Sequence, residues 1–186
     1  MFIQTETTPN PATLKFLPGR TVLPAGTRDF SDAGEAAAVS PLAARLFEVD
    51  GVTGVFFGSD FVSVTKGRGE WQQLKPAVLG AIMEHFLSGE PVMLGGHGAG
   101  DASGEDFDPS DAEVVAAIKE LIETRVRPAV ANDGGDIIFR GFRGGTVYLK
   151  MQGACSGCPS STATLRHGIE NLLKHFVPEV EAVQPV

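Results

Sequence analysis

The sequence predicts an α+β protein made of two small α/β sandwich domains joined by a flexible, acidic, glycine-rich linker. Three observations support this fold class. Apolar residues recur at helical spacing in several segments, strand-like apolar runs flank short glycine turns, and a stretch rich in glycine and acidic residues divides the chain. We place the first domain at 1–88, the linker at 89–109 and the second domain at 110–186.

The first domain is predicted to contain two pairs of strands, each pair followed by a helix. Thr8-Pro9-Asn10-Pro11 is a turn sequence between the first two strands, and Ser40-Pro41 has the residue types of an N-cap and a first helical position. In chain order we expect strands at 2–7 and 12–17, a helix from Ser40 to Gly51, strands at 52–57 and 61–66, and a helix at 71–87.

The second domain is predicted to be a helix, a hairpin, a second helix and a strand at the sheet edge. Ser110 and Glu113 have capping-box spacing at the start of the first helix, and Pro128 ends or kinks it. The remaining elements are the turn 133–136, strands 137–142 and 146–152 around Arg143-Gly144-Gly145, a helix opening at Pro159, and an edge strand at 180–183.

Composition excludes several classes of function. The net charge is −8, with −6 on residues 1–107 and −2 on 108–186, so neither half is a basic module for nucleic acid or an anionic membrane. No apolar run has the length of a membrane span. Two cysteines cannot staple a secreted scaffold, and no signal-like leader precedes Phe2, so we expect an intracellular, reducing compartment.

Both cysteines, Cys155 and Cys158, lie in one glycine-flanked loop between a predicted strand and a predicted helix. A helix amino terminus favours thiolate over thiol, and two intervening residues let both sulfurs reach one metal centre. A zinc or iron–sulfur site usually takes four such ligands, so the simplest arrangement is a cluster shared between two chains. A dithiol–disulfide redox pair, a shared structural zinc and two inert cysteines are the alternatives.

Two sets of motifs, one in each half of the chain, resemble the Nfu family of iron–sulfur proteins, whose carboxy-terminal module is the NifU-like domain. The resemblance extends over nearly all of the chain apart from the linker. In the second half it rests on Asp133-Gly134-Gly135-Asp136, 151–161 and the segments 168–170 and 177–180, and in the first half on 4–11, 40–43, 54–58 and 61–66.

This resemblance implies a carrier or scaffold and not an enzyme. Two copies would form a homodimer by binding one [4Fe–4S] cluster, or alternatively a [2Fe–2S] cluster, through Cys155 and Cys158 of each, and would deliver it to apo iron–sulfur client proteins. The first domain would recognise clients or upstream assembly factors. The compartment would be the bacterial cytoplasm, or the mitochondrial matrix if a presequence has been removed. Nucleic acid and membrane are not expected as partners.

Other polar residues have less specific interpretations. Asp133 and Asp136 most simply belong to a turn in which both intervening glycines take positive φ, with a metal site as the alternative. Arg140, Arg143 and Lys150 are expected on the solvent face of the hairpin, and His85 is expected to be structural or at the surface.

Overall fold

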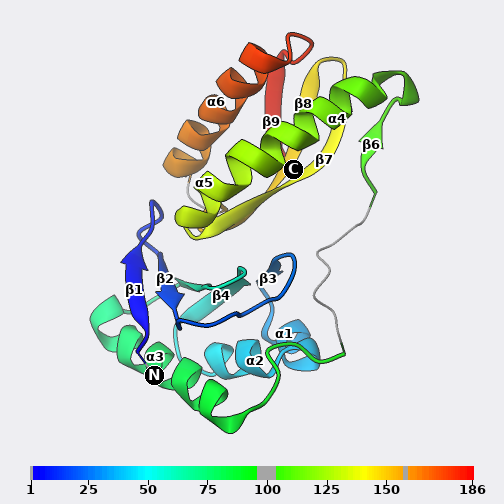
Figure 1. The fold of residues 1–186 in the computed structure, drawn as a ribbon. Helices are drawn as coiled ribbons and strands as arrows, with labels where there is room; N and C mark the ends of the chain where they lie inside the picture. Colours follow the sequence, from blue (N-terminus) through cyan, green and yellow to red (C-terminus); the bar gives the residue numbers. More distant parts are fainter. Residues whose placement is uncertain (1, 96–103, 157–158) are drawn as a thin grey trace. The chain divides into compact units, whose positions relative to one another are not determined.

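The computed structural model describes residues 2–95, 104–156 and 159–186. The chain forms two compact units, Met1–Asp101 and Ala102–Val186. Each unit has one sheet and its own hydrophobic core (Figure 1). Helices and strands occur in both units, which confirms the predicted α+β class. Among the described residues, no helix combines the length and apolar character needed to cross a bilayer.

The sheet of the first unit is antiparallel throughout, with the strand order β1-β2-β5-β4-β3. Leu14 and Phe16 alternate with polar neighbours along β2 and belong to the core, so they lie on the same face of the strand. The predicted hairpin is confirmed by the pairing of the first two strands. The strands are β1 (Gln4–Thr7), β2 (Thr13–Leu17), β3 (Arg28–Phe30), β4 (Val52–Phe57) and β5 (Val62–Lys66).

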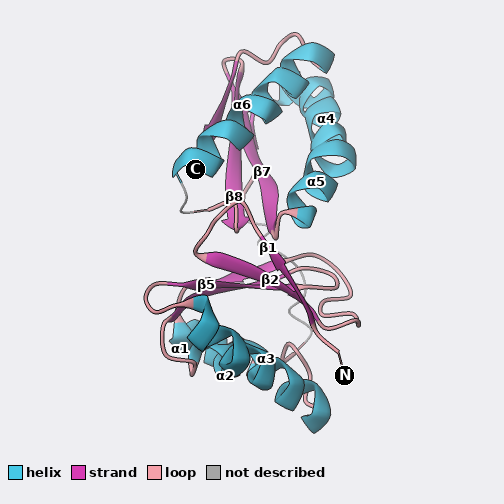
Figure 2. Cartoon of the chain, turned by 90° about the vertical axis from the view of Figure 1, so that its left-hand side faces the viewer, coloured by secondary structure: helices cyan, strands magenta, loops and turns pink. Residues whose placement is uncertain are grey.

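Three helices cover one face of this sheet (Figure 2). They are α1 (Ala33–Val39), α2 (Pro41–Phe47) and α3 (Trp71–Ser88). The predicted starts of α2 and α3 are confirmed, and Ser40 caps α2 by accepting a hydrogen bond from the Ala43 amide. Strand β3 and helix α1 were not predicted, because both are short and lack a distinctive apolar period.

The sheet of the second unit is mixed, with the order β6-β7-β8-β9. Its centre is the predicted hairpin, whose two-residue turn is Gly144-Gly145 with φ of 56° and 81°. The two edge strands each run parallel to their neighbour. The strands are β6 (Asp106–Phe107), β7 (Gly135–Arg143), β8 (Thr146–Gly153) and β9 (Ala182–Pro185).

The helices of this unit lie on one face of its sheet (Figure 2). The first continues past Pro128 to Asn132, so the proline does not end it. A π-helical stretch, Ile122–Val126, precedes the proline, and its wider turn accommodates a residue that lacks an amide proton. The α-helical parts are α4 (Ala112–Leu121), α5 (Arg127–Asn132) and α6 (Pro159–Phe176).

The start of α4 also differs from the prediction. The Ser110 side chain does not cap the helix. Asp108 instead accepts hydrogen bonds from the amide and hydroxyl of Ser110 within a short 3₁₀ turn, Pro109–Asp111. The helix begins one residue later at Ala112, and its N-cap, Asp111, makes no side-chain capping bond. Asp108 is the stronger competitor because a carboxylate accepts two such bonds at once.

Both ends of the segment 89–109 contact the units that they flank. Val92 and Met93 pack against the core of the first unit, and the Val92 carbonyl accepts a 2.6 Å hydrogen bond from Ser40. At the other end, β6 pairs with β7, and Asp106 forms an ion pair with Arg143. Residues 96–103 of this segment lie outside the described residues.

Candidate metal centre

The cysteine loop connects the end of β8 to the start of α6. Gly153 takes a φ of 64°, which turns the chain away from the strand. The amide and hydroxyl of Ser156 both donate to the Gly153 carbonyl, at 3.1 and 2.9 Å, and the Thr162 hydroxyl donates to the Cys155 carbonyl at 3.0 Å. Cys158 lies outside the described residues. The described part of the loop is therefore tied to both the strand and the helix.

The thiol of Cys155 is buried, with 5% of the residue exposed, and it belongs to the core of the second unit. It lies directly against the backbone of Gly135, the first residue of β7. A Cβ atom at Gly135 would lie 2.6 Å from Cys155 Sγ and 2.7 Å from the Gln152 carbonyl oxygen, closer than packed atoms approach. Only glycine leaves room for this sulfur.

The two neighbouring glycines have different roles, which corrects the prediction that both take positive φ. Gly134 has a φ of 79° and makes the turn between α5 and β7. Its carbonyl accepts a hydrogen bond from the Ala154 amide at 3.2 Å, which joins this turn to the cysteine loop. Gly135 is extended in the strand, and what it supplies is space for the thiol.

Burial raises the pKa of the Cys155 thiol to about 12, and the nearby carboxylates of Asp133 and Asp136 act in the same direction. The described conformation therefore favours the protonated thiol, whereas the sequence argument expected the helix amino terminus to favour thiolate. Desolvation of the charged form is the largest cause of this shift. Metal ligation at Cys155 requires the release of this proton.

Asp136 forms a buried ion pair with Arg127 on α5. Arg127 Nε and Nη2 each donate to one carboxylate oxygen at 2.8 Å, and the Ile137 amide also donates to Asp136 at 2.8 Å. The Asp136 side chain is 4% exposed. Its hydrogen bonds, together with one from Glu123, hold the pKa of Arg127 above its ordinary value although burial opposes this. The Asp136 carboxylate is therefore paired with the guanidinium of the same chain.

The sequence argument missed Arg127, because no periodic pattern links a helical arginine to an aspartate nine residues later. It also missed the burial of Gln152, which lies opposite Asp136 in the β7–β8 register. The Gln152 side-chain oxygen is buried and has no hydrogen-bond partner among the described residues. Within that same part of the chain, no three histidine, cysteine or acidic residues gather as a metal site.

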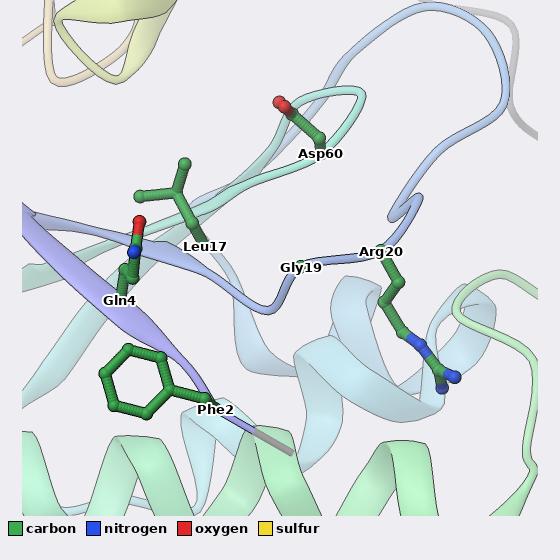
Figure 3. Close-up of a pocket in the computed structure, with 6 residues that line it drawn as sticks. All are labelled: Phe2, Gln4, Leu17, Gly19, Arg20 and Asp60. Carbon is green, nitrogen blue, oxygen red and sulfur yellow. The ribbon is translucent and has the colours of Figure 1, made fainter.

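A hollow of about 450 Å³ in the first unit is a second candidate for a binding site (Figure 3). Its lining includes Phe2, which precedes β1, and Leu17, the last residue of β2, together with Arg20 and Asp60. Figure 3 shows the Arg20 and Asp60 side chains pointing in opposite directions, and the Arg20 guanidinium lies 5.1 Å from the centre of the Phe86 ring. The charged groups that line the hollow therefore do not point toward one common position for a ligand.

Comparison with known proteins matches both units to described domains. Residues 3–89 match the family model for the scaffold protein Nfu/NifU N terminal, and residues 118–184 match the NifU-like domain. A protein of Homo sapiens named NFU1 iron-sulfur cluster scaffold homolog, mitochondrial, is 51% identical over the full length of this chain, which spans 72% of that relative. The NifU-like protein 4, mitochondrial, of Arabidopsis thaliana is 51% identical, over 99% of this chain and 65% of its own length.

Among solved structures, a NifU-like protein from Saccharomyces cerevisiae matches 51% of this chain and 86% of its own, with 27% identity and a TM-score of 0.46. The relatives from Homo sapiens and Arabidopsis thaliana are each about half identical to this chain, over both units and the segment between them. Members of one family are recognised at this level of identity. The chain belongs to the Nfu family, as a protein that combines the Nfu/NifU amino-terminal domain with a NifU-like domain.

Proposed function

We propose that this protein is a carrier of iron–sulfur clusters, in which two chains hold one [4Fe–4S] cluster, or alternatively one [2Fe–2S] cluster, through Cys155 and Cys158 of each. The observation that supports this most directly is the position of Cys155, at the start of a glycine-turned loop between β8 and α6. Two thiols per chain complete a four-sulfur ligand set only when two chains combine. The names of the relatives, as iron–sulfur cluster scaffold homologs, support the same cargo.

Delivery to a client protein is a ligand exchange and needs no catalytic group. A client thiolate bonds to a cluster iron, the bond from that iron to Cys155 or Cys158 breaks, and the released thiolate takes up a proton. The burial of Cys155 supports the last of these steps, because the protonated thiol is stable in the core once the cluster has left. Among the described residues, that core contains one proposed sulfur ligand among aliphatic and aromatic side chains, so folding need not depend on the metal.

The remaining parts of the proposal rest on family membership. The first unit would recognise apo clients or upstream assembly factors, and the protein would act without turnover of a substrate. The curated relatives are mitochondrial by name, and the compartment of this chain would be the mitochondrial matrix or a bacterial cytoplasm. The net charge of −8 supports protein partners over nucleic acid or anionic membrane.

Anaerobic reconstitution with iron and sulfide tests the proposal. The expected product absorbs near 400 nm, contains about four irons and four sulfides per two chains, and has twice the monomer mass. Cys155→Ala and Cys158→Ala should each abolish cluster binding while both units stay folded by circular dichroism. Ser156→Ala is the matched control in the same loop, because it retains both thiols.

Two results would contradict the proposal. The first is a Cys155→Ala chain that still holds the full complement of iron and sulfide. The second is a metal-free chain that stays colourless after reconstitution and instead reduces the disulfides of insulin, which would make Cys155 and Cys158 a redox pair. The burial of Cys155 argues against that second activity, since the attacking group must be an accessible thiolate.

A further inference from the structure

The position of the Cys155 sulfur in the cluster-free protein depends on Gly135. Sγ lies in the space that a Cβ at Gly135 would occupy, and the Gln152 carbonyl and Cys155 amide close the same space at 2.7 and 3.1 Å from that point. A small displacement of Gly135 therefore moves or releases the thiol. Whatever holds Gly135 in place also holds the proposed cluster ligand.

Gly135 follows a short turn and is the first residue of β7, where it pairs with Gly153 of β8. The amides of Asp133 and Gly134 bond back to α5 at 3.0 Å each, and the Gly134 carbonyl receives the Ala154 amide. These bonds connect the turn to the helix before it and to the cysteine loop. Pairing with β8 directs the strand from Gly135 onward, and a side-chain contact across the turn adds a restraint between α5 and β7.

The ion pair of Arg127 and Asp136 is that contact. Arg127 lies on α5, before the turn, and Asp136 immediately follows Gly135 in β7. Two parallel N–H···O bonds of 2.8 Å fix the planes of the guanidinium and the carboxylate, so the pair restrains direction as well as distance. The Ile137 amide further orients the carboxylate from the strand side.

We propose that Arg127 is a positioning residue for Cys155: through its fork with Asp136 it closes the turn that seats the thiol against Gly135. The inference rests on the proposed function in so far as Cys155 is a cluster ligand. It goes beyond that function because it assigns control of the ligand to a side chain on another element, 28 positions earlier in the chain.

The chain contains a matched ion pair for comparison. Arg143 and Asp106 form the same kind of fork, with Nε–Oδ2 at 2.8 Å, where the opposite end of β7 meets β6. The two side chains are 61% and 67% exposed, and this end of the strand is opposite to the end at which Gly135 pairs with Gly153. Arg143→Gln thus removes an arginine fork from the same strand without changing the turn at Gly135.

The test measures the rate at which iodoacetamide alkylates Cys155 in the full, cluster-free chain carrying Cys158→Ala, where one thiol remains. Arg127→Gln should raise this rate by about tenfold, since a buried thiol reacts only when its surroundings open. Arg143→Gln should leave the rate within about twofold of the parent. Arg127→Lys, which keeps the charge but loses the fork, should fall between them.

The double variant Arg127→Gln with Asp136→Asn distinguishes a loss of stability from a loss of positioning, because it leaves no buried charge at this site. If the pair positions the thiol, this variant is folded and its alkylation rate stays raised. A folded double variant that reacts at the parent rate would overturn the proposal. The same measurement tests the proposal if Arg127→Gln alone does not fold.

With both cysteines present, reconstituted Arg127→Gln should lose iron to a chelator about tenfold faster than the parent, and Arg143→Gln should not. The two proposals fail in different ways. A chain that never takes up a cluster refutes the carrier function while the alkylation rates still test the role of Arg127. Normal cluster uptake with unchanged alkylation refutes the positioning role alone.

Discussion

Cys155 and His85 are two polar side chains that the fold buries away from water. Cys155 lies in a space that glycine provides, and its burial favours the neutral thiol. His85, at the end of α3, is completely buried, and neither ring nitrogen has a hydrogen-bond partner among the described residues. The prediction of a structural or surface histidine is thus confirmed in its structural form.

We expect His85 to make the first unit sensitive to acid. Burial lowers the pKa of its imidazole, and the charge of Arg45 acts in the same direction. Below about pH 6.5, the unfolded chain therefore binds a proton at His85 that the folded state does not bind. The free energy of unfolding should fall as the pH drops below that value, by up to about 1.4 kcal/mol per pH unit. Above that value, this loss of stability should be absent.

Urea denaturation at pH 7.5 and pH 5 measures this effect in the parent and in His85→Leu. The substitution removes both unpaired nitrogens and the titration, so the variant should lose less stability between the two pH values. His175→Gln, at an exposed position on α6, is the control and should follow the parent. Equal pH dependence in the parent and in His85→Leu would show that another group is responsible.

At the scale of elements, Ser40 joins two helices and the segment that follows α3. It is the C-cap of α1 and the N-cap of α2, where its hydroxyl accepts from the Ala43 amide at 3.1 Å. The same hydroxyl donates to the Val92 carbonyl at 2.6 Å. Ser40 and Ala43 are completely buried, whereas Val92 is half-buried.

Ser40→Ala should therefore lower the free energy of unfolding by about 2 kcal/mol, the upper part of the range for a lost N-cap, because the half-buried Val92 carbonyl also loses its donor. Asp32→Ala is the comparison, since Asp32 caps α1 through a single exposed bond to the Glu35 amide. That change should cost about 1 kcal/mol or less. Chemical denaturation gives both values, and equal losses would mean that the bond to Val92 contributes nothing.

Element-level predictions succeeded where local chemistry decides the outcome. The glycine turn between β7 and β8 and the proline-initiated start of α2 follow from allowed φ values and missing donors, which depend only on residue type. The π-helical stretch before Pro128 was not predictable in this way. Its wider turn is stabilised by packing of Ile122 and Val126 in the core, and that packing depends on residues distant in sequence.

At the scale of the whole molecule, each unit has its own buried core and the proposed ligand belongs to one of them. Cys155 packs in the core of Ala102–Val186. A cluster that binds only the folded form of this unit stabilises it by mass action, and the unit Met1–Asp101 has no share in that binding energy.

Amide hydrogen exchange should therefore slow in Ala102–Val186 on cluster loading, by roughly 100-fold where exchange requires full unfolding and the free cluster source is at about 100 times its dissociation constant. Exchange in α3 and in the sheet of the first unit should not change. The Cys155→Ala chain, treated in the same way, is the control. Protection spread evenly over both units would contradict separate stabilisation.

The sequence was sufficient for the two α+β domains, most of their elements and the identity of the candidate ligands. Apolar periodicity, turn residues and the spacing of Cys155 and Cys158 are local properties of the chain. Tertiary contacts were needed for the rest: the seat of the thiol against Gly135, the fork between Arg127 and Asp136, and the burial of His85. Each of these depends on desolvation or on a close approach between separate elements, and neither quantity exists until the chain has packed.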